Sequence, residues 1–126
     1  VLDQRLIRNG SLGILKRAGV EIHARSVFLQ GLLLMKPEGL PPFFDGIKKH
    51  LKGFHEFLSR RGLTPVQGAI GFIKSISEID VVLCGVTGAH ELEKILEAFF
   101  NTDVLPAAED YALSDTTILT PSCWKL

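Results

Sequence analysis

The sequence predicts an α/β domain in which short parallel strands alternate with helices, and three observations lead to this prediction. Residues 20–25 alternate apolar and polar side chains, and residues 79–84 form a short, apolar, β-branched run, as strands do. Apolar residues recur every three or four positions in the segments around them, which is typical of amphipathic helices. Each strand-like run also leads into a loop that contains glycine, the pattern of strand-to-helix units.

The composition fits a single domain over residues 1–126 and excludes several kinds of partner. Fourteen basic and fourteen acidic residues give no formal net charge, so no nucleic acid partner and no anionic membrane partner are expected. No apolar run is long enough to cross a bilayer. Cys84 and Cys123 lie far apart and outside any metal-binding spacing, which predicts no metal site and favours a cytoplasmic location.

The first part of the chain is predicted to be a helix followed by a strand. The chain opens with Val1-Leu2-Asp3, inside an apolar phrase, so we expect either a cut or a processed start, not the natural beginning of a domain. Ser11 is the predicted N-cap of the helix, and Gly19 is predicted to end it. A buried strand is expected at residues 21–25, with His23 as a structural side chain that finds a partner.

The middle of the chain predicts a loop and two packed helices. Residues 36–42 contain three prolines and a glycine, which we expect to prevent regular structure. The long helix that follows, which Gly62 ends, is predicted to face inward through Phe44, Ile47, Leu51, Phe54, Phe57 and Leu58. Thr64 and Pro65 are a strong start signal for a second helix, in which Gly68 and Gly71 permit close packing.

The last third predicts a second strand, a helix and an irregular tail. Residues 79–84 are apolar on both faces, as expected for a strand that is covered on both sides. The helix over residues 89–100 is predicted to face inward through Leu92, Ile95, Leu96 and Phe99. Residues 101–126 are predicted to be an irregular tail with a short helix near 107–113 and Trp124 as its anchor.

The loops that follow the two strands are the candidate binding site, because parallel sheets hold ligands at the carboxyl ends of their strands. Ser26, Gln30 and Gly31 follow the first strand, and residues 85–88 lead into a helix N-terminus that can hold an anion. The alternative is that Ser26 and Gln30 only satisfy backbone groups and that the glycine loop binds nothing. The sequence has no H-E-x-x-H, G-x-S-x-G or P-loop motif.

Four phrases resemble, in order, the C-terminal part of the aldo/keto reductases. They are Leu-Asp-Gln-Arg-Leu at 2–6, Gly-Val-Glu-Ile-His-Ala-Arg-Ser-Val-Phe-Leu-Gln-Gly-Leu-Leu at 19–33, Val-Leu-Cys-Gly-Val-Thr at 82–87 and Glu-Leu-Glu-Lys-Ile-Leu at 91–96. The resemblance covers nearly the whole chain. It implies part of a (β/α)8 TIM-type barrel, in which residues 1–6 leave the sixth strand and residues 21–25 and 81–84 are the seventh and eighth strands.

The resemblance also implies an oxidoreductase that reduces aldehydes or ketones with NADPH or NADH. The family's catalytic Asp, Tyr, Lys and His lie in the first half of the barrel, so no catalytic residue is expected here. Ser26 matches the serine that contacts the pyrophosphate, and Arg25 stands where an aromatic side chain usually stacks under the nicotinamide. An acidic Glu91 would repel a 2′-phosphate, and Ile95 stands where an asparagine commonly contacts adenine. The other matching cofactor-binding positions are Phe28, Gln30, Gly31, Gly85, Val86 and Thr87.

Three functions are open from the sequence. The first is a C-terminal segment of such a reductase, which is inactive alone and meets the carbonyl substrate only in the full-length enzyme. The second is a non-catalytic dinucleotide-binding module. The third function is a structural or oligomerisation domain in which the helix around Phe54 and Phe57 packs on a partner. Because two or three parallel strands cannot close a barrel, an ordered isolated chain is expected to form a homo-oligomer or to rearrange.

Overall fold

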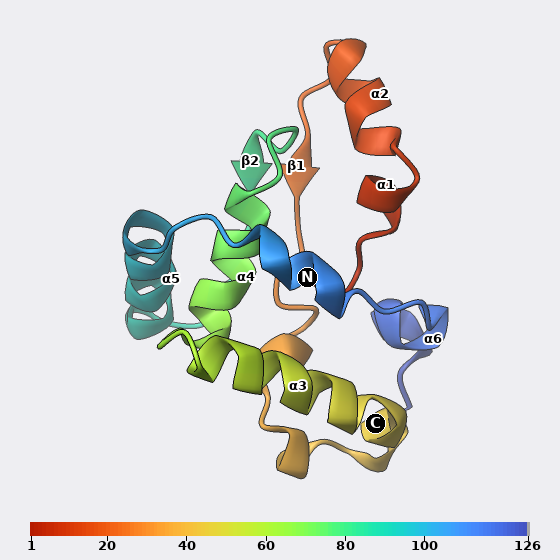
Figure 1. Ribbon diagram of the computed structural model, residues 1–126, viewed down its shortest axis with the longest axis vertical. Helices are drawn as coiled ribbons and strands as arrows, with labels where there is room; N and C mark the ends of the chain where they lie inside the picture. Colours follow the sequence, from red (N-terminus) through yellow and green to blue (C-terminus); the bar gives the residue numbers. More distant parts are fainter. Residues whose placement is uncertain (126) are drawn as a thin grey trace.

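The computed structural model describes residues 1–125, and Leu126, the last residue of the predicted tail, lies outside the described residues. The α-helices and strands follow one another in the order expected of an α/β protein (Figure 1). They are α1 (Arg5–Arg8), α2 (Ser11–Arg17), β1 (His23–Ala24), α3 (Lys48–Ser59), α4 (Pro65–Lys74), β2 (Val81–Val82), α5 (Ala89–Asn101) and α6 (Thr116–Leu119). Five 3₁₀ helices lie between them: η1 (Leu32–Leu34), η2 (Pro37–Gly39), η3 (Pro42–Ile47), η4 (Pro106–Tyr111) and η5 (Pro121–Cys123).

The two strands pair in parallel, as predicted, but they are shorter and less buried than predicted. His23 lies opposite Val81, and Ala24 lies opposite Val82. Within residues 1–125 the sheet has only these two strands, so each strand has one unpaired edge. The prediction of two buried strands is therefore wrong: His23 is exposed and the β2 residues are half-buried, because no further strand covers them.

The helix before β1 begins and ends close to the predicted residues. Gly10, not Ser11, occupies the N-cap position and has a φ of 75°, while the side-chain oxygen of Asn9 accepts a hydrogen bond from the Ser11 N–H at 3.0 Å. The N-cap prediction for Ser11 is thus wrong by one residue. Gly19 ends the helix as predicted, because its left-handed φ of 76° turns the chain so that the N–H of Val20 reaches the Leu15 carbonyl oxygen at 3.1 Å.

Helices α3 and α4 form the best-packed part of the molecule. All six side chains predicted to face inward from residues 44–58 are buried, with Leu51, Phe54 and Leu58 fully so. Gly62 has a φ of 67° and follows the end of α3. Thr64 caps α4 and also completes a capping box with Gln67, which makes this helix start unusually well defined.

The two glycines of α4 allow close packing, as predicted. A Cβ atom at Gly68 would come within 2.5 Å of the Leu58 side chain, and one at Gly71 would come within 2.8 Å of the Asp103 carbonyl oxygen. Both positions are buried. The helix can therefore lie against α3 on one side and against the start of the tail on the other only because no side chain is present.

The proline-rich segment and the tail contain short helices instead of irregular chain. Residues 36–42 include η2 and the start of η3, so the prediction of no regular structure there is wrong: Pro37 starts η2 and Pro42 starts η3. In the tail, η4 covers most of the helix predicted near 107–113, and α6 follows it. Trp124 is the predicted anchor: its indole N–H donates to the Ile118 carbonyl oxygen at 2.9 Å, and its ring meets Phe44 edge to face.

Helix α5 forms where it was predicted, but most of its apolar face has no partner. Ile95 and Ala98 pack inward against the rest of the protein, and α5 contacts α4. In contrast, Leu92, Leu96 and Phe99 are 45%, 46% and 41% exposed. The predicted inward face is therefore only partly correct. Among the described residues no helix is long and apolar enough to traverse a lipid bilayer.

Candidate functional site

The parallel pairing brings the two candidate loops to the same edge of the sheet. The Leu83 N–H donates to the Ala24 carbonyl oxygen at 2.8 Å, so the two strands end side by side. Arg25 and Ser26 continue from β1, and the loop to α5 continues from β2. The carboxyl ends of parallel strands are the usual ligand-binding edge of α/β proteins, so this is the candidate site.

The loop after β1 is held in a strained conformation. Three of its non-glycine residues, Ser26, Leu29 and Gln30, have φ between 47° and 56°, and Gly31 has a φ of 83°. The left-handed region costs an L-residue about 1–2 kcal/mol. The loop keeps this shape because Val27 and Leu29 are buried, and because the Leu29 N–H donates to the Ser26 carbonyl oxygen at 2.8 Å. Strain of this kind is concentrated at binding sites in many proteins.

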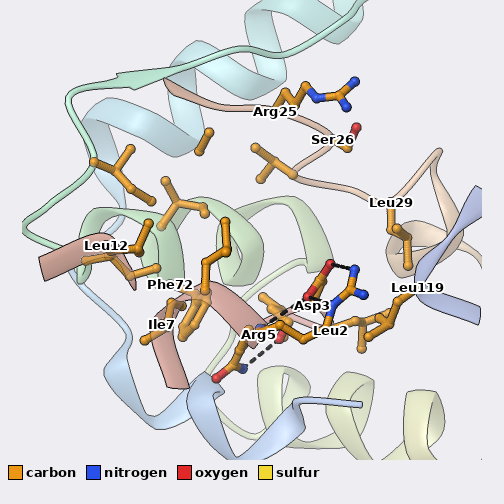
Figure 2. A pocket seen from close by; sticks show the side chains of 18 of the residues that line it. Leu2, Asp3, Arg5, Ile7, Leu12, Arg25, Ser26, Leu29, Phe72 and Leu119 are labelled. Carbon is orange, nitrogen blue, oxygen red and sulfur yellow. Dashed lines mark hydrogen bonds and ion pairs between the residues drawn. The ribbon is translucent and has the colours of Figure 1, made fainter. Parts of the chain in front are cut away.

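Next to this loop lies a cavity of about 550 Å³ between β1 and the α1–α2 segment. Ligand pockets in proteins usually measure about 300–1,000 Å³. Figure 2 shows Arg25 and Ser26 on one side of the cavity and the paired Asp3 and Arg5 on the other. The apolar part of its wall includes Leu2, Ile7, Leu12, Val27, Leu29 and Phe72.

Only part of the predicted site borders this cavity. Arg25 and Ser26 are exposed and line it, and within residues 1–125 the Ser26 hydroxyl has no hydrogen-bond partner in the protein. Phe28 packs against the core, and the Gln30 side chain is exposed. The predicted residues that do not line the cavity are Phe28, Gln30, Gly31, Gly85, Val86, Thr87 and Glu91.

In the loop before α5, the hydrogen-bond donors of Thr87 are already occupied by Glu91, a side chain of the helix itself. The Glu91 carboxylate accepts hydrogen bonds from the Thr87 N–H at 2.8 Å and from the Thr87 hydroxyl at 2.9 Å. These bonds, the backbone one first, lower the pKa of Glu91, so the side chain stays ionised at neutral pH. A negative charge therefore already lies at this helix N-terminus, where it opposes the binding of a second anion.

Sequence reasoning assigned no role to Asp80, yet this residue joins three elements. Its carboxylate accepts from the Ile22 N–H at 2.8 Å and pairs with Lys16 of α2. The backbone bond from Ile22 and then Lys16 lower the pKa of Asp80. The signal in the sequence was an acidic residue inside an otherwise apolar strand. His23 finds a partner, Glu21, as predicted, but its side chain is exposed and not part of a buried strand.

Asp3 was likewise missed, although it lies at the cavity wall. Arg5 donates from Nε at 2.9 Å and from Nη2 at 2.7 Å to its two carboxylate oxygens, and this side-chain bonding lowers the pKa of Asp3. In the part of the chain that the structure describes, no three His, Cys, Asp or Glu side chains are grouped to bind a metal ion.

Comparisons with known proteins found no match to any protein-family model, curated protein or solved structure. The chemistry of the site therefore rests on the geometry. Among the described residues Arg25 has no ion-pair partner and the Ser26 hydroxyl has no hydrogen-bond partner. Both border a largely apolar cavity, which suits a ligand with an anionic group and a flat apolar ring.

Proposed function

We propose that this chain is the C-terminal, cofactor-binding segment of an aldo/keto reductase barrel, which reduces aldehydes or ketones with a nicotinamide dinucleotide. The observation that carries the proposal is the position of Ser26. It lies at the carboxyl end of a parallel strand, on a strained loop, at the wall of a cavity of about 550 Å³. This is where a (β/α)8 barrel holds its ligands. The two unpaired strand edges also fit a sheet that other strands would complete.

The residues of the β1 loop fit a dinucleotide pyrophosphate. In this proposal the Ser26 hydroxyl donates to a phosphate oxygen, while Arg25 neutralises charge or lays its guanidinium plane on the nicotinamide ring. Gln30 and Gly31 contribute through the shape of the loop, and Phe28 fixes the loop to the core. The chemistry that a bound NADH or NADPH supplies is hydride transfer to a carbonyl carbon.

The residues of the α5 loop do not fit a 2′-phosphate. Gly85, Val86 and Thr87 would meet the adenosine side of the cofactor through their backbone. The Glu91 carboxylate, however, occupies the Thr87 N–H and places a negative charge there. NADPH carries a phosphate at this point and NADH does not, so the proposed cofactor is NADH.

The test is a fluorescence titration of the purified chain with NADH and with NADPH. We expect saturable binding that is tighter for NADH, and a loss of about fivefold in affinity for Ser26→Ala, the size of one hydrogen bond. Ser77→Ala is the matched control, because this exposed serine precedes β2 at the other end of the sheet. The absence of binding by either cofactor, or equal losses in the two serine variants, would overturn the proposal.

Glu91→Gln tests the cofactor preference separately. Glutamine can still accept from Thr87 but carries no charge, so NADPH should gain affinity relative to NADH. An unchanged ratio would show that Glu91 does not contact the adenosine end. The chain should show no reduction of a generic aldehyde, because the family's catalytic residues lie outside it; measurable turnover would contradict that part of the proposal.

A further inference from the structure

The molecule has two exposed apolar faces, one on each side of its sheet. On one side, α5 exposes Leu92, Leu96, Phe99 and Phe100, of which Phe100 is 75% exposed. On the other side, the α1–α2 segment exposes Leu6, Ile14, Leu15 and Val20, with exposures between 39% and 59%. Figure 1 shows α5 on the β2 side of the sheet and α2 on the β1 side. Exposed apolar side chains gathered on one side of a protein often mark an interaction site.

Each face lies beside an unpaired strand edge. The N–H groups of Val81 and Leu83 donate toward β1, so the backbone of Val82 between them points away from it. On β1, the carbonyl oxygens of Ile22 and Ala24 accept from the β2 segment, so the His23 backbone points to the opposite edge. That second edge borders the cavity, whose lining includes residues 22–24 on one side and Ile7 and Leu12 on the other. A strand could enter there and pair with β1.

The two faces carry opposite charge although the whole chain is neutral. Residues 1–20 contain four basic side chains and one acidic side chain, and α5 contains three glutamates and one lysine. Asp3 neutralises Arg5, and Asp80 neutralises Lys16. Among the described residues Arg8 and Arg17 have no ion-pair partner, and Arg8 donates only a long hydrogen bond, of 3.5 Å, to the Glu109 carbonyl oxygen. On α5, Glu93 and Glu97 lie one helical turn apart beside the exposed apolar residues.

We infer that the chain associates head to tail with a second copy of itself, the β2–α5 side of one copy docking against the β1 edge and the α1–α2 face of the next. This arrangement continues the parallel sheet in the same direction, covers both apolar faces and pairs Glu93 and Glu97 with Arg8 and Arg17. The interface is heterologous, so copies form a closed ring or a chain of increasing length. An isologous α5–α5 contact would instead place acidic residues against acidic residues.

Sedimentation velocity from low to high micromolar concentration tests this inference, and it is run without nucleotide because the docked strand would enter the cavity proposed for the cofactor. The wild-type chain should associate, and raised salt should weaken the association because the exposed charges are screened. The double charge reversals E93K/E97K and R8E/R17E should each weaken association by about tenfold or more, because attraction becomes repulsion at two positions. Mixing these two variants should restore it, since each variant then offers the other complementary faces.

The matched control is E38K/E56K, which reverses two exposed glutamates on η2 and α3, away from both faces. It should associate like the wild-type chain, and circular dichroism should show all variants folded. Three results would overturn the inference: a monomer at every concentration, association that E93K/E97K leaves unchanged, or a mixture that remains monomeric. An effect of E93K/E97K without an effect of R8E/R17E would indicate an α5–α5 contact and would equally overturn it.

Discussion

Helices α3 and α5 have equally regular apolar patterns but different surroundings. In α3 the inward-facing Leu51 and Phe54 are fully buried, and the helix packs against η2, η3, α4 and η4. In α5 the corresponding Leu92 and Leu96 are 45% and 46% exposed, and only Ile95 and Ala98 pack inward. The comparison shows that periodicity identifies a helix and its apolar face, whereas it does not show whether the same chain supplies a partner for that face.

The same difference separates the two halves of the molecule. Around α3, long-range contacts close the core: His55 Nε2 lies 2.9 Å from the Leu33 carbonyl oxygen, and His50 Nε2 lies 3.0 Å from the Tyr111 carbonyl oxygen. Around the sheet, each of the two short strands has one unpaired edge, and their side chains are exposed or half-buried. The open half is also the half that contains the candidate site and both association faces.

The largest expected effect compares the same substitution in the two helices. Leu51→Ala removes a fully buried side chain and should lower the free energy of unfolding by about 2–5 kcal/mol. Leu96→Ala removes a half-exposed one and should cost less than about 1 kcal/mol. Urea unfolding of both variants, at a concentration where the chain is monomeric, measures the difference. Equal costs would mean that α5 is packed as tightly as α3, contrary to the comparison.

A second pair of substitutions probes how tightly α3 and α4 meet. Gly68→Ala places a Cβ atom 2.5 Å from the Leu58 side chain, and such overpacking should cost about 1–3 kcal/mol. Gly53→Ala in α3 meets its nearest neighbour, the Tyr111 ring, at 3.9 Å, so it should stabilise the helix by up to about 1 kcal/mol. Thermal unfolding should therefore move in opposite directions for the two variants. A stabilising Gly68→Ala would show that the helix contact is looser than described.

The smallest expected effect concerns the open half and its pH dependence. The ionised form of Asp80 accepts from Ile22 and Lys16, which lowers its pKa below the usual 3.8. A lowered folded-state pKa gives stability that is present above the unfolded pKa and is lost as the pH falls through the folded one. From about pH 6 to about pH 3, the wild-type chain should therefore lose more stability than Asp80→Asn. Urea midpoints across this range measure the loss of stability in each protein. Equal losses in the two proteins would show that the ionised Asp80 side chain does not stabilise the fold.

The sequence was sufficient where local chemistry decides the structure. Thr64 and Pro65 predicted the start of α4, because a capping side chain and a fixed φ act within one turn. The apolar pattern predicted the buried face of α3 for the same reason. The sequence was insufficient where a distant partner decides: the bonds of Asp80 to α2 and β1, and the exposure of the α5 face, depend on which elements meet.

In the candidate site, too, the features set by local sequence were predictable and those set by distant contacts were not. That a loop with Ser26 follows a parallel strand was predictable from the order of strand and loop residues. Its three left-handed non-glycine residues were not, because their φ values depend on the burial of Val27 and Leu29 in the folded core. The sequence showed the negative charge of Glu91 but not its hydrogen bond from the Thr87 N–H. That bond could not be predicted because it forms only once the turn before α5 has folded.

The central claim is that the carboxyl edge of the sheet binds a nicotinamide dinucleotide, and amide NMR of the labelled chain with NADH tests it most directly. We expect chemical shifts to change in residues 25–31 and 85–87 as NADH is added, with the α3 amides unaffected, and Ser26→Ala to reduce the changes. No shift changes at saturating NADH, or changes confined to regions outside these two loops, would contradict the claim.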